Sequence, residues 1–442
     1  MRTHLPFWLL LLLYLLVGSL FAIYTPPWQA PDEPAHYNYI RQLAGGSLPV
    51  IAPGDYDQEY QGTVISSRFD PQYSVYIAFS YEDWQPPLYY LLQTPVYLLF
   101  AGALLPLRLV SVLLGAGVVA LAYAVGQQVW PGRERRWWWL TAAAFVAFLP
   151  QHVAILSSVN NDALAELLIA ALLWLLLRMP ADAPAGARAW LGVGVLLGLG
   201  FLTKATVYIM VPVVGLVLLR LYWRQWRALW QAAVRVGIPA GLLGALWWGR
   251  NLLVYGGLDP LATAAHDAVV VGQPRTNEWL AIYGPAGVLL RFVRTTFQSF
   301  WGQFGWMAAP MPNWVYGPLL LLTLVVGLGL ALAVVDRRRT AGEARPGQRD
   351  GRRALLVLGS TFLFSVLVYL GYNVTFVQHQ GRYLFSALLP LGMGVALGLH
   401  TLARPVLVRW RLGEGWIPAG LALALSALVL VALFKFIVPY LA

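Results

Sequence analysis

Long runs of apolar residues, separated by short polar segments, dominate this chain. A helix rises about 1.5 Å per residue, so about 20 apolar residues are needed to cross the hydrocarbon core of a bilayer. The pattern predicts about eleven such spans. They cover residues 7–24, 106–130, 138–156, 163–178, 189–203, 206–221, 233–250, 314–335, 354–372, 383–403 and 415–440. The expected fold is an all-α polytopic membrane protein, with residues 1–442 as one domain.

Three polar connections interrupt this pattern. Residues 25–105 hold many Pro, Gly and acidic residues, and an acid at mid-bilayer costs roughly 3 kcal/mol, so we expect a long outer loop there. Within it, Pro87–Ala103 is apolar and rich in Tyr and Leu, and we expect an interfacial helix because a full crossing would reverse the parity of the later spans. Residues 251–313 are expected to form a second outer loop, and 336–353 a basic cytoplasmic loop.

The composition agrees with a membrane protein, because 59% of the residues are hydrophobic and 11% are charged. Soluble domains carry about 25% charged residues, so a soluble or disordered chain is excluded. A net charge of +11 could indicate nucleic acid, but the basic residues gather in loops on one side of the expected spans and most acids on the other. This positive-inside pattern predicts a multi-pass protein of the inner (plasma) membrane with a cytoplasmic N-terminus and no nucleic-acid partner.

The strongest local candidate for chemistry follows the first span, in the segment Gln29–Tyr37. Pro34 suits the first turn of a helix, and Asp32 or Glu33 could simply cap that helix. Alternatively, the two carboxylates face outward at the membrane surface. There they could take a proton from a hydroxyl group or hold a divalent cation.

Further candidates lie near the outer ends of the expected spans. Asn160, Asn161 and Asp162 stand at a helix start, where capping explains them well, although Asp162 could also support the carboxylates. The outer cations suit either snorkelling or phosphate recognition. They are Lys204, Arg250, Arg291, Arg294 and Arg382.

The order of these motifs resembles the GT-C superfamily of integral membrane glycosyltransferases. The motifs are Pro31-Asp32-Glu33-Pro34, Pro86-Pro87-Leu88-Tyr89-Tyr90, Asn161-Asp162-Ala163, Phe201-Leu202-Thr203-Lys204, Trp248-x-Arg250-Asn251 and Gln380-Gly381-Arg382-Tyr383. Protein O-mannosyltransferase-like and lipid A aminoarabinose transferase-like proteins look similar. An uncharacterised bacterial family of membrane proteins with a Pro-Asp-Glu-Pro motif looks closer, and the segment Ser299–Trp306 also resembles that family.

The resemblance implies a GT-C-like fold and a polyprenyl-phosphate-linked sugar as donor. It implies that the catalytic residues are Asp32 and Glu33. The residues expected to bind substrate are His36, Tyr89, Asp162, Lys204, Arg250, Gln303, Arg382 and Tyr383. No metal or other cofactor is required by the sequence, although Mg or Mn could bind at Asp32, Glu33 and Asp162. Expected partners are membrane lipids, the donor, and a lipid, glycan or protein acceptor.

The function expected from these residues is transfer of the sugar to an acceptor hydroxyl on the outer face of the membrane. Asp32 would act as the base, and a single displacement would invert the anomeric carbon. Two other functions stay open. A lipid-linked sugar flippase or transporter would need polar groups along a path through the bilayer. A polysaccharide polymerase or ligase would differ mainly in its acceptor.

Overall fold

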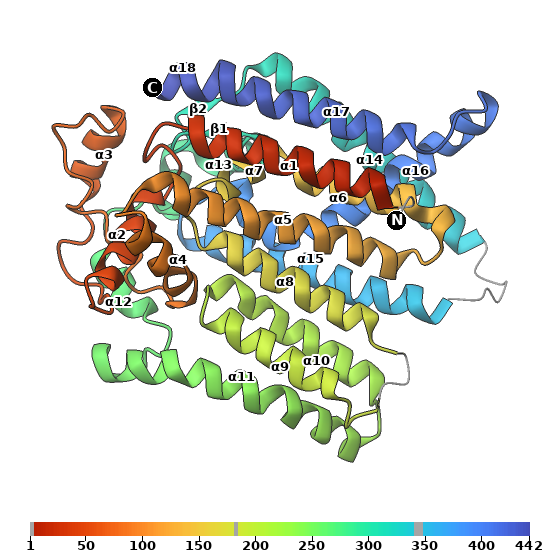
Figure 1. The fold of residues 1–442 in the computed structure, drawn as a ribbon, viewed down its shortest axis with the longest axis horizontal. Helices are drawn as coiled ribbons and strands as arrows, with labels where there is room; N and C mark the ends of the chain where they lie inside the picture. The colour runs from red at the N-terminus through yellow and green to blue at the C-terminus, as the bar shows by residue number, and fades with distance from the viewer. Residues whose placement is uncertain (1–3, 181–183, 340–347) are drawn as a thin grey trace.

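The computed structural model describes residues 4–180, 184–339 and 348–442. It is a bundle of long helices with a cap of shorter helices at one end (Figure 1). The first half contains α1 (Leu5–Tyr24), α2 (Glu33–Ala44), α3 (Gln58–Ser66), α4 (Leu88–Leu99), α5 (Leu104–Val129), η2 (Arg133–Arg135), α6 (Arg136–Phe148), α7 (Pro150–Leu156), α8 (Asp162–Arg178), α9 (Arg188–Phe201), η3 (Ala205–Ile209) and α10 (Met210–Leu221). The second half contains α11 (Trp226–Tyr255), α12 (Thr263–Val269), α13 (Thr276–Trp301), β1 (Gln303–Phe304), β2 (Ala309–Pro310), α14 (Asn313–Arg339), α15 (Gln348–Thr375), η4 (Gly381–Ala387), α16 (Leu388–Arg409), α17 (Trp416–Val431), η5 (Ala432–Ile437) and α18 (Val438–Leu441).

The helices fall on the apolar runs of the sequence. Within the described residues, seven helices are long and apolar enough to cross a membrane, and α6 with α7 would make an eighth although they meet at a 63° bend. Two shorter apolar helices, Arg188–Phe201 and Ala205–Leu221, lie on two further expected spans. The fold is therefore an all-α, multi-pass membrane protein, as expected, while the number of eleven crossings stays a prediction.

The two ends of the bundle differ in character. Figure 1 shows α2, α3, α12 and the C-terminus at one end, which we call the site end, and the N-terminus at the opposite end. The α5–α6 connection also lies at the N-terminal end (Figure 1). Of the expected basic loop 336–353, residues 340–347 lie outside the described residues.

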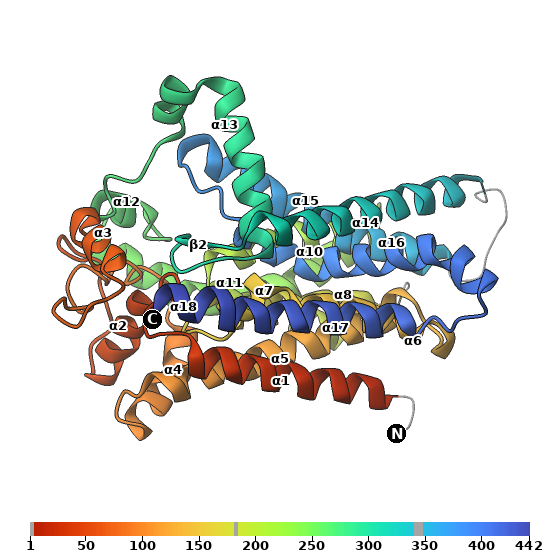
Figure 2. The same ribbon diagram turned by 90° about the horizontal axis from the view of Figure 1, so that it is seen from above.

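The first expected outer loop folds into α2, α3 and α4 at the site end (Figures 1 and 2). Pro34 occupies the first turn of α2, and the N–H of Gly45 bonds to the carbonyl of Arg41 at its end. Tyr39 and Tyr90 stack with their ring centroids 3.8 Å apart, which joins α2 to α4. The 12 residues of α4 extend about 18 Å, too short to cross a bilayer of about 30 Å.

The second expected outer loop contains α12, the whole of α13 and the short β1–β2 hairpin, in which Gln303 pairs with Pro310. α13 bends at Gly284, whose φ of +67° favours glycine, and Pro285 follows it. Figure 2 shows the first half of α13 projecting away from the bundle. Its second half returns to pack on η4, which carries the residues of the site described next.

Candidate functional site

Asp32 and Arg382 form an ion pair at the site end of the bundle. The Nη2 of Arg382 donates to Oδ2 of Asp32 at 2.6 Å, and the hydroxyl of Tyr81 donates to Oδ1 at 2.8 Å. The side chain of Asp32 therefore binds Arg382 and Tyr81, and it makes no cap hydrogen bond to α2. The simple capping role that the sequence left open is thus wrong for this side chain. Burial by itself would raise the pKa of Asp32, but Arg382 and Tyr81 outweigh it and lower this pKa to about 2. Asp32 is ionised at neutral pH.

Two features of the backbone position the ion pair: a left-handed conformation at Asp32 and a close approach of η4 to α13 at Gly381. Asp32 has a φ of +67°, a left-handed conformation that costs energy for any residue with a side chain. On the other side, a Cβ added to Gly381 would overlap the backbone of Thr296 and Phe300 on α13. The N–H of Gly381 also donates to the hydroxyl of Ser299 at 2.7 Å. Glycine at 381 thus lets η4 approach α13, which places Arg382.

A second ion pair joins Asp162 at the start of α8 to Lys204, which follows α9. The Nζ of Lys204 lies 2.7 Å from Oδ1 of Asp162, and both side chains are partly exposed. Asn160, two residues earlier, accepts a hydrogen bond from the N–H of Asp162 at 2.8 Å. Asn160 thus binds the backbone at the start of α8, the expected N-cap residue Asn161 makes no side-chain cap bond, and the carboxylate of Asp162 binds Lys204.

The two ion pairs act on each other through their charges. The charge of Arg382 acts on Asp162, and that of Asp162 acts on Arg382. Burial, and then the charges of Lys204 and Arg382, lower the pKa of His36 to about 3. His36 is therefore neutral, and its Nδ1 lies 2.9 Å from the hydroxyl of Tyr90. We name the group of ionisable residues that interact here the charged cluster. It comprises Asp32, Glu82, Asp162, Lys204 and Arg382.

Glu82 is a member of the charged cluster that the sequence did not single out. Burial and then the negative charge of Asp32 raise the pKa of Glu82 to about 7, although Lys204, a hydrogen bond with Gln85 and Arg382 act in the opposite direction. Its Oε2 is buried and has no hydrogen-bond partner among the residues the structure describes. Tyr81 and Glu82 lie in a loop without periodic pattern, so only the fold reveals that Tyr81 binds Asp32 and that the charge of Asp32 acts on Glu82.

Glu33 departs from the expected pair of catalytic carboxylates. It is fully buried, and its two oxygens accept hydrogen bonds from Nε and Nη2 of Arg108 at 2.8 and 2.6 Å. The backbone N–H groups of Trp28 and Val159 also donate to it, each at 3.1 Å. All of these partners differ from those of Asp32. Glu33 therefore joins the first loop to α5 and to the segment before α8, and its expected catalytic role stays a prediction.

Arg108 completes this junction, although its sequence position did not mark it as a candidate. Its Nη1 donates to the carbonyls of Ala22 and Thr25 at the end of α1, at 3.0 and 2.7 Å. A signal was present, because a single arginine within an apolar span demands a partner. The sequence alone did not name that partner, which lies 75 residues earlier in the chain.

Two other expected substrate-binding residues, Tyr89 and Arg250, bind neighbouring protein groups. The hydroxyl of Tyr89 lies 2.8 Å from that of Ser111 and accepts from the N–H of Asn160 at 3.0 Å. Arg250 donates to the hydroxyl of Tyr255 at 3.1 Å and to the carbonyl of Pro49. Both side chains thus connect parts of the chain that are distant in sequence, and substrate binding by them stays a prediction.

Gln303 and Tyr383 lie on segments that the fold brings toward the bundle. The side chain of Gln303 donates to the carbonyl of Met307 at 2.8 Å, and its N–H donates to Gln151 at 2.9 Å. Tyr383 follows Arg382, whose guanidinium lies 5.5 Å from the centre of the Tyr383 ring. Of these two, Tyr383 is the one adjacent to the charged cluster.

The residues expected to hold a divalent cation do not fit such a site. Among the described residues, no group of three or more His, Asp or Glu side chains could hold a metal ion. Asp32 pairs with Arg382, and Asp162 pairs with Lys204. Glu33 pairs with Arg108. Each carboxylate thus has its own basic partner, and the three do not converge on a common point.

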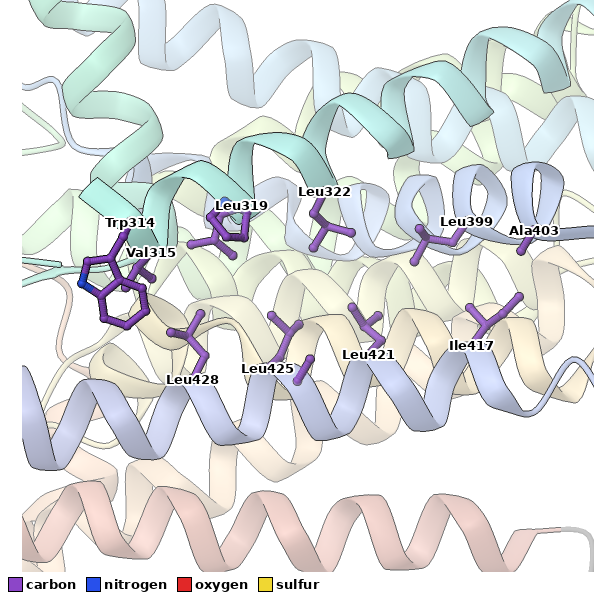
Figure 3. A pocket seen from close by; sticks show the side chains of 12 residues that line it. Trp314, Val315, Leu319, Leu322, Leu399, Ala403, Ile417, Leu421, Leu425 and Leu428 are labelled. Atoms are coloured by element: carbon purple, nitrogen blue, oxygen red, sulfur yellow. The ribbon is translucent and has the colours of Figure 1, made fainter. Parts of the chain in front are cut away.

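An apolar cavity of about 550 Å³ lies between α14, α16 and α17 (Figure 3). Side chains from the three helices, among them Trp314, Leu319, Leu399, Leu421 and Leu425, point into it. Such a lining suits hydrocarbon rather than a charged group. The charged cluster instead comes from the first loop, α8, η4 and the segment after α9, so the cavity and the ionic site are separate features.

Solved structures of two membrane enzymes are similar to this chain, whereas no curated protein matches its sequence. ArnT from Cupriavidus metallidurans bound to undecaprenyl phosphate has a TM-score of 0.48 at 15% identity, over 98% of this chain and 74% of that one. The oligosaccharyltransferase from Archaeoglobus fulgidus, in complex with Zn and sulfate, has a TM-score of 0.46 at 13% identity, over 95% of this chain and 53% of that one.

A family model gives the decisive match. It covers residues 69–391, which is well over half of the chain and includes Glu82, Asp162, Lys204 and Arg382, while Asp32 lies before it. The description of that family is limited to a membrane location. The chain belongs to the family of predicted membrane proteins described as DUF2142.

Proposed function

We propose that this protein is a glycosyltransferase that moves a sugar from a polyprenyl-phosphate-linked donor to an acceptor hydroxyl. The observation that carries the proposal is the ion pair of Asp32 and Arg382 at one end of a membrane helix bundle, beside the second pair of Asp162 and Lys204. A lipid-linked sugar phosphate needs a site of this kind at the membrane surface, because its tail stays in the bilayer. The resemblance of the motif order to GT-C enzymes supports the same proposal.

Arg382 and Lys204 are proposed to hold the donor phosphate. Both cations are mostly buried, with 9% and 18% of their side chains exposed, so their charges are weakly screened by water. The planar guanidinium suits bidentate contact with phosphate oxygens. As the bond from phosphate to sugar breaks, negative charge develops on the phosphate, and fixed cations stabilise it.

Asp32 is proposed to become the base when the phosphate binds. Paired with Arg382, Asp32 has a low affinity for protons. A phosphate that draws Arg382 away removes the main group that keeps this pKa low, and burial then raises it. Proton acceptance is thus coupled to the presence of donor.

The bond changes balance in a single displacement. Asp32 takes the proton from the acceptor hydroxyl, and the acceptor oxygen bonds to the anomeric carbon. The bond between that carbon and the phosphate oxygen breaks, and its electron pair leaves with the polyprenyl phosphate. One displacement without a covalent enzyme intermediate inverts the anomeric carbon.

The proposed location is the outer face of the inner membrane. The basic loops of the sequence favour a cytoplasmic N-terminal end of the bundle, so the site end would face outward. There the acceptor would be a lipid, a glycan or a protein with a free hydroxyl. Neutral His36 adds a polar wall without a further charge.

The test uses purified protein in lipid nanodiscs with a synthetic polyprenyl-phosphate sugar. We expect release of polyprenyl phosphate in the presence of an acceptor mixture, and its loss in Asp32→Asn. Asp70→Asn is the control, because Asp70 is an exposed acid of the same loop. Full turnover by Asp32→Asn would remove Asp32 as the base. Movement of labelled donor across vesicles without any transfer would instead favour the flippase, and chain extension would favour the polymerase.

A further inference from the structure

Glu82 combines three properties that the proposed reaction does not yet use. It belongs to the charged cluster, where the charges of Asp32, Lys204 and Arg382 act on it. Its Oε2 is buried without a hydrogen-bond partner in the described part of the chain. It follows Tyr81, whose hydroxyl donates directly to Asp32, and Asp32 is the charge that acts most strongly on Glu82.

Asp32 and Glu82, two of the three acids of the charged cluster, differ in their affinity for protons. Asp32 is bound by Arg382 and Tyr81 and releases protons readily, with a pKa of about 2. Burial and the charge of Asp32 raise the pKa of Glu82 to about 7. A proton that reaches Asp32 while Arg382 is nearby is therefore held more tightly by Glu82.

We propose that Glu82 is the proton store of this site, the carboxylate on which the proton of the acceptor hydroxyl comes to rest. The inference rests on the proposed function. In the step, protonated Asp32 and ionised Glu82 become ionised Asp32 and protonated Glu82, so charge and atoms balance. Ionised Asp32 can then pair again with Arg382 as the polyprenyl phosphate leaves. Glu82 acts through Asp32, and its own proton passes to water before the next turnover.

Other groups around Glu82 have different assignments. The charge of Glu82 acts on Tyr81, Tyr90 and, on α15, Tyr372. The hydroxyls of Tyr81 and Tyr90 keep their protons at neutral pH, because burial raises their pKa values. Lys204 is a cation held by Asp162. Asp83, the next residue, accepts from Gln42 at 2.7 Å, and the charges that act on it are those of Asp55, Glu82 and Arg41. Glu82 is thus the group with a proton affinity near neutrality that also interacts with Asp32.

The experiment measures transfer from pH 5 to pH 9 with the synthetic donor in nanodiscs. Glu82 must be ionised to receive a proton, so the wild-type kcat should rise with pH through about 7 and then level off. In Glu82→Gln we expect kcat to fall about 100-fold at pH 8, the magnitude typical of a lost proton acceptor, and the rise near pH 7 to disappear. The KM for the donor should change by less than about twofold, because Glu82 does not hold the phosphate.

Two further variants keep the test sharp. Asp83→Asn is the matched control: its pKa is also about 7, but its partner is Gln42, so the rise near pH 7 should persist. Glu82→Asp keeps a carboxylate, so its kcat should still rise with pH, but at a shifted pH. This variant also tests the inference if Glu82→Gln does not fold. The inference is overturned if Glu82→Gln keeps the wild-type profile, or if Glu82→Asp leaves the position of the rise unchanged. Loss of all transfer in the wild type would instead overturn the proposed function.

Discussion

The guanidinium of Arg382 donates to the carboxylate of Asp32 at 2.6 Å across 350 residues of sequence. Asp32 precedes α2 in the first loop, and Arg382 lies in η4 near the end of the chain. A contact of such range forms only when the whole bundle has assembled. The proposed chemistry is therefore a property of the complete fold and of no separate segment.

Arg382→Lys should weaken donor binding while the protein still folds. A lysine keeps the positive charge but loses the planar fork that suits bidentate contact with phosphate oxygens. We expect the donor KM to rise about tenfold, a loss of about 1.4 kcal/mol of binding free energy. Titration of the variant with donor in nanodiscs measures this. An unchanged KM together with an unchanged kcat would argue that Arg382 holds only Asp32.

Lys204→Met should also weaken donor binding. Its removal leaves Asp162 without its partner, so Lys204→Met/Asp162→Asn restores neutrality as a control for misfolding. Both variants should bind donor more weakly than the wild type, by about tenfold, because both lack the cation. If the double variant regains the wild-type KM, Lys204 serves only to neutralise Asp162.

Breaking the buried pair of Glu33 and Arg108 should destabilise the fold rather than the chemistry. Arg108→Met leaves the carboxylate of Glu33 buried without its cation, which costs about 3–5 kcal/mol in comparable pairs. Thermal unfolding in detergent should show a lower midpoint than wild type. The double variant Glu33→Gln/Arg108→Met should recover part of the loss. Activity per folded molecule should persist in the double variant, whereas its complete loss would restore Glu33 as a catalytic candidate.

The ion pair of Asp32 should make stability depend on acid pH. The pKa of Asp32 is lowered from 3.8 to about 2, so its contribution is present above pH 4 and is lost as the pH falls toward 2. The shift corresponds to about 2 kcal/mol. The wild type should therefore lose more stability than Asp32→Asn between pH 4 and pH 2. Parallel unfolding curves for the two proteins would contradict this.

Asp83 should have the opposite effect on stability. Burial raises its pKa from 3.8 to about 7, so the folded state is destabilised as the pH rises from about 4 to 7 and the buried carboxyl ionises. Asp83→Asn should match the wild type at pH 4 and unfold at a higher temperature at pH 8. Equal midpoints at pH 8 would mean that the hydrogen bond from Gln42 compensates for burial.

The sequence predicted the fold class and several members of the charged cluster for a physical reason. Apolar runs indicate membrane helices directly, and a charged residue at the end of such a run must lie near the membrane surface. Asp32, Asp162, Lys204 and Arg382 all follow this logic, and the structure brings them together.

The remaining features depend on contacts that no local pattern encodes. Glu33 neighbours Asp32 in sequence, yet Asp32 precedes α2 in a left-handed conformation while Glu33 begins the helix, and the two carboxylates bind different partners. Glu82 lies in a loop, where periodicity gives no direction. Tyr89 lies in a recognisable motif, but its hydroxyl accepts a hydrogen bond from the backbone N–H of Asn160.

The junction of Arg108 with Glu33 has a consequence for how the chain enters the membrane. An arginine within an inserting helix is unfavourable by about 2.5–3.5 kcal/mol at mid-span, and less near an end. Glu33 leaves the ribosome before Arg108, and so do the carbonyls at the end of α1 that Arg108 also binds. The partners are thus already synthesised when α5 is inserted. α1, the first loop and α5 are suited to assemble as an early unit during translation, onto which the later helices, including the one that carries Arg382, are added.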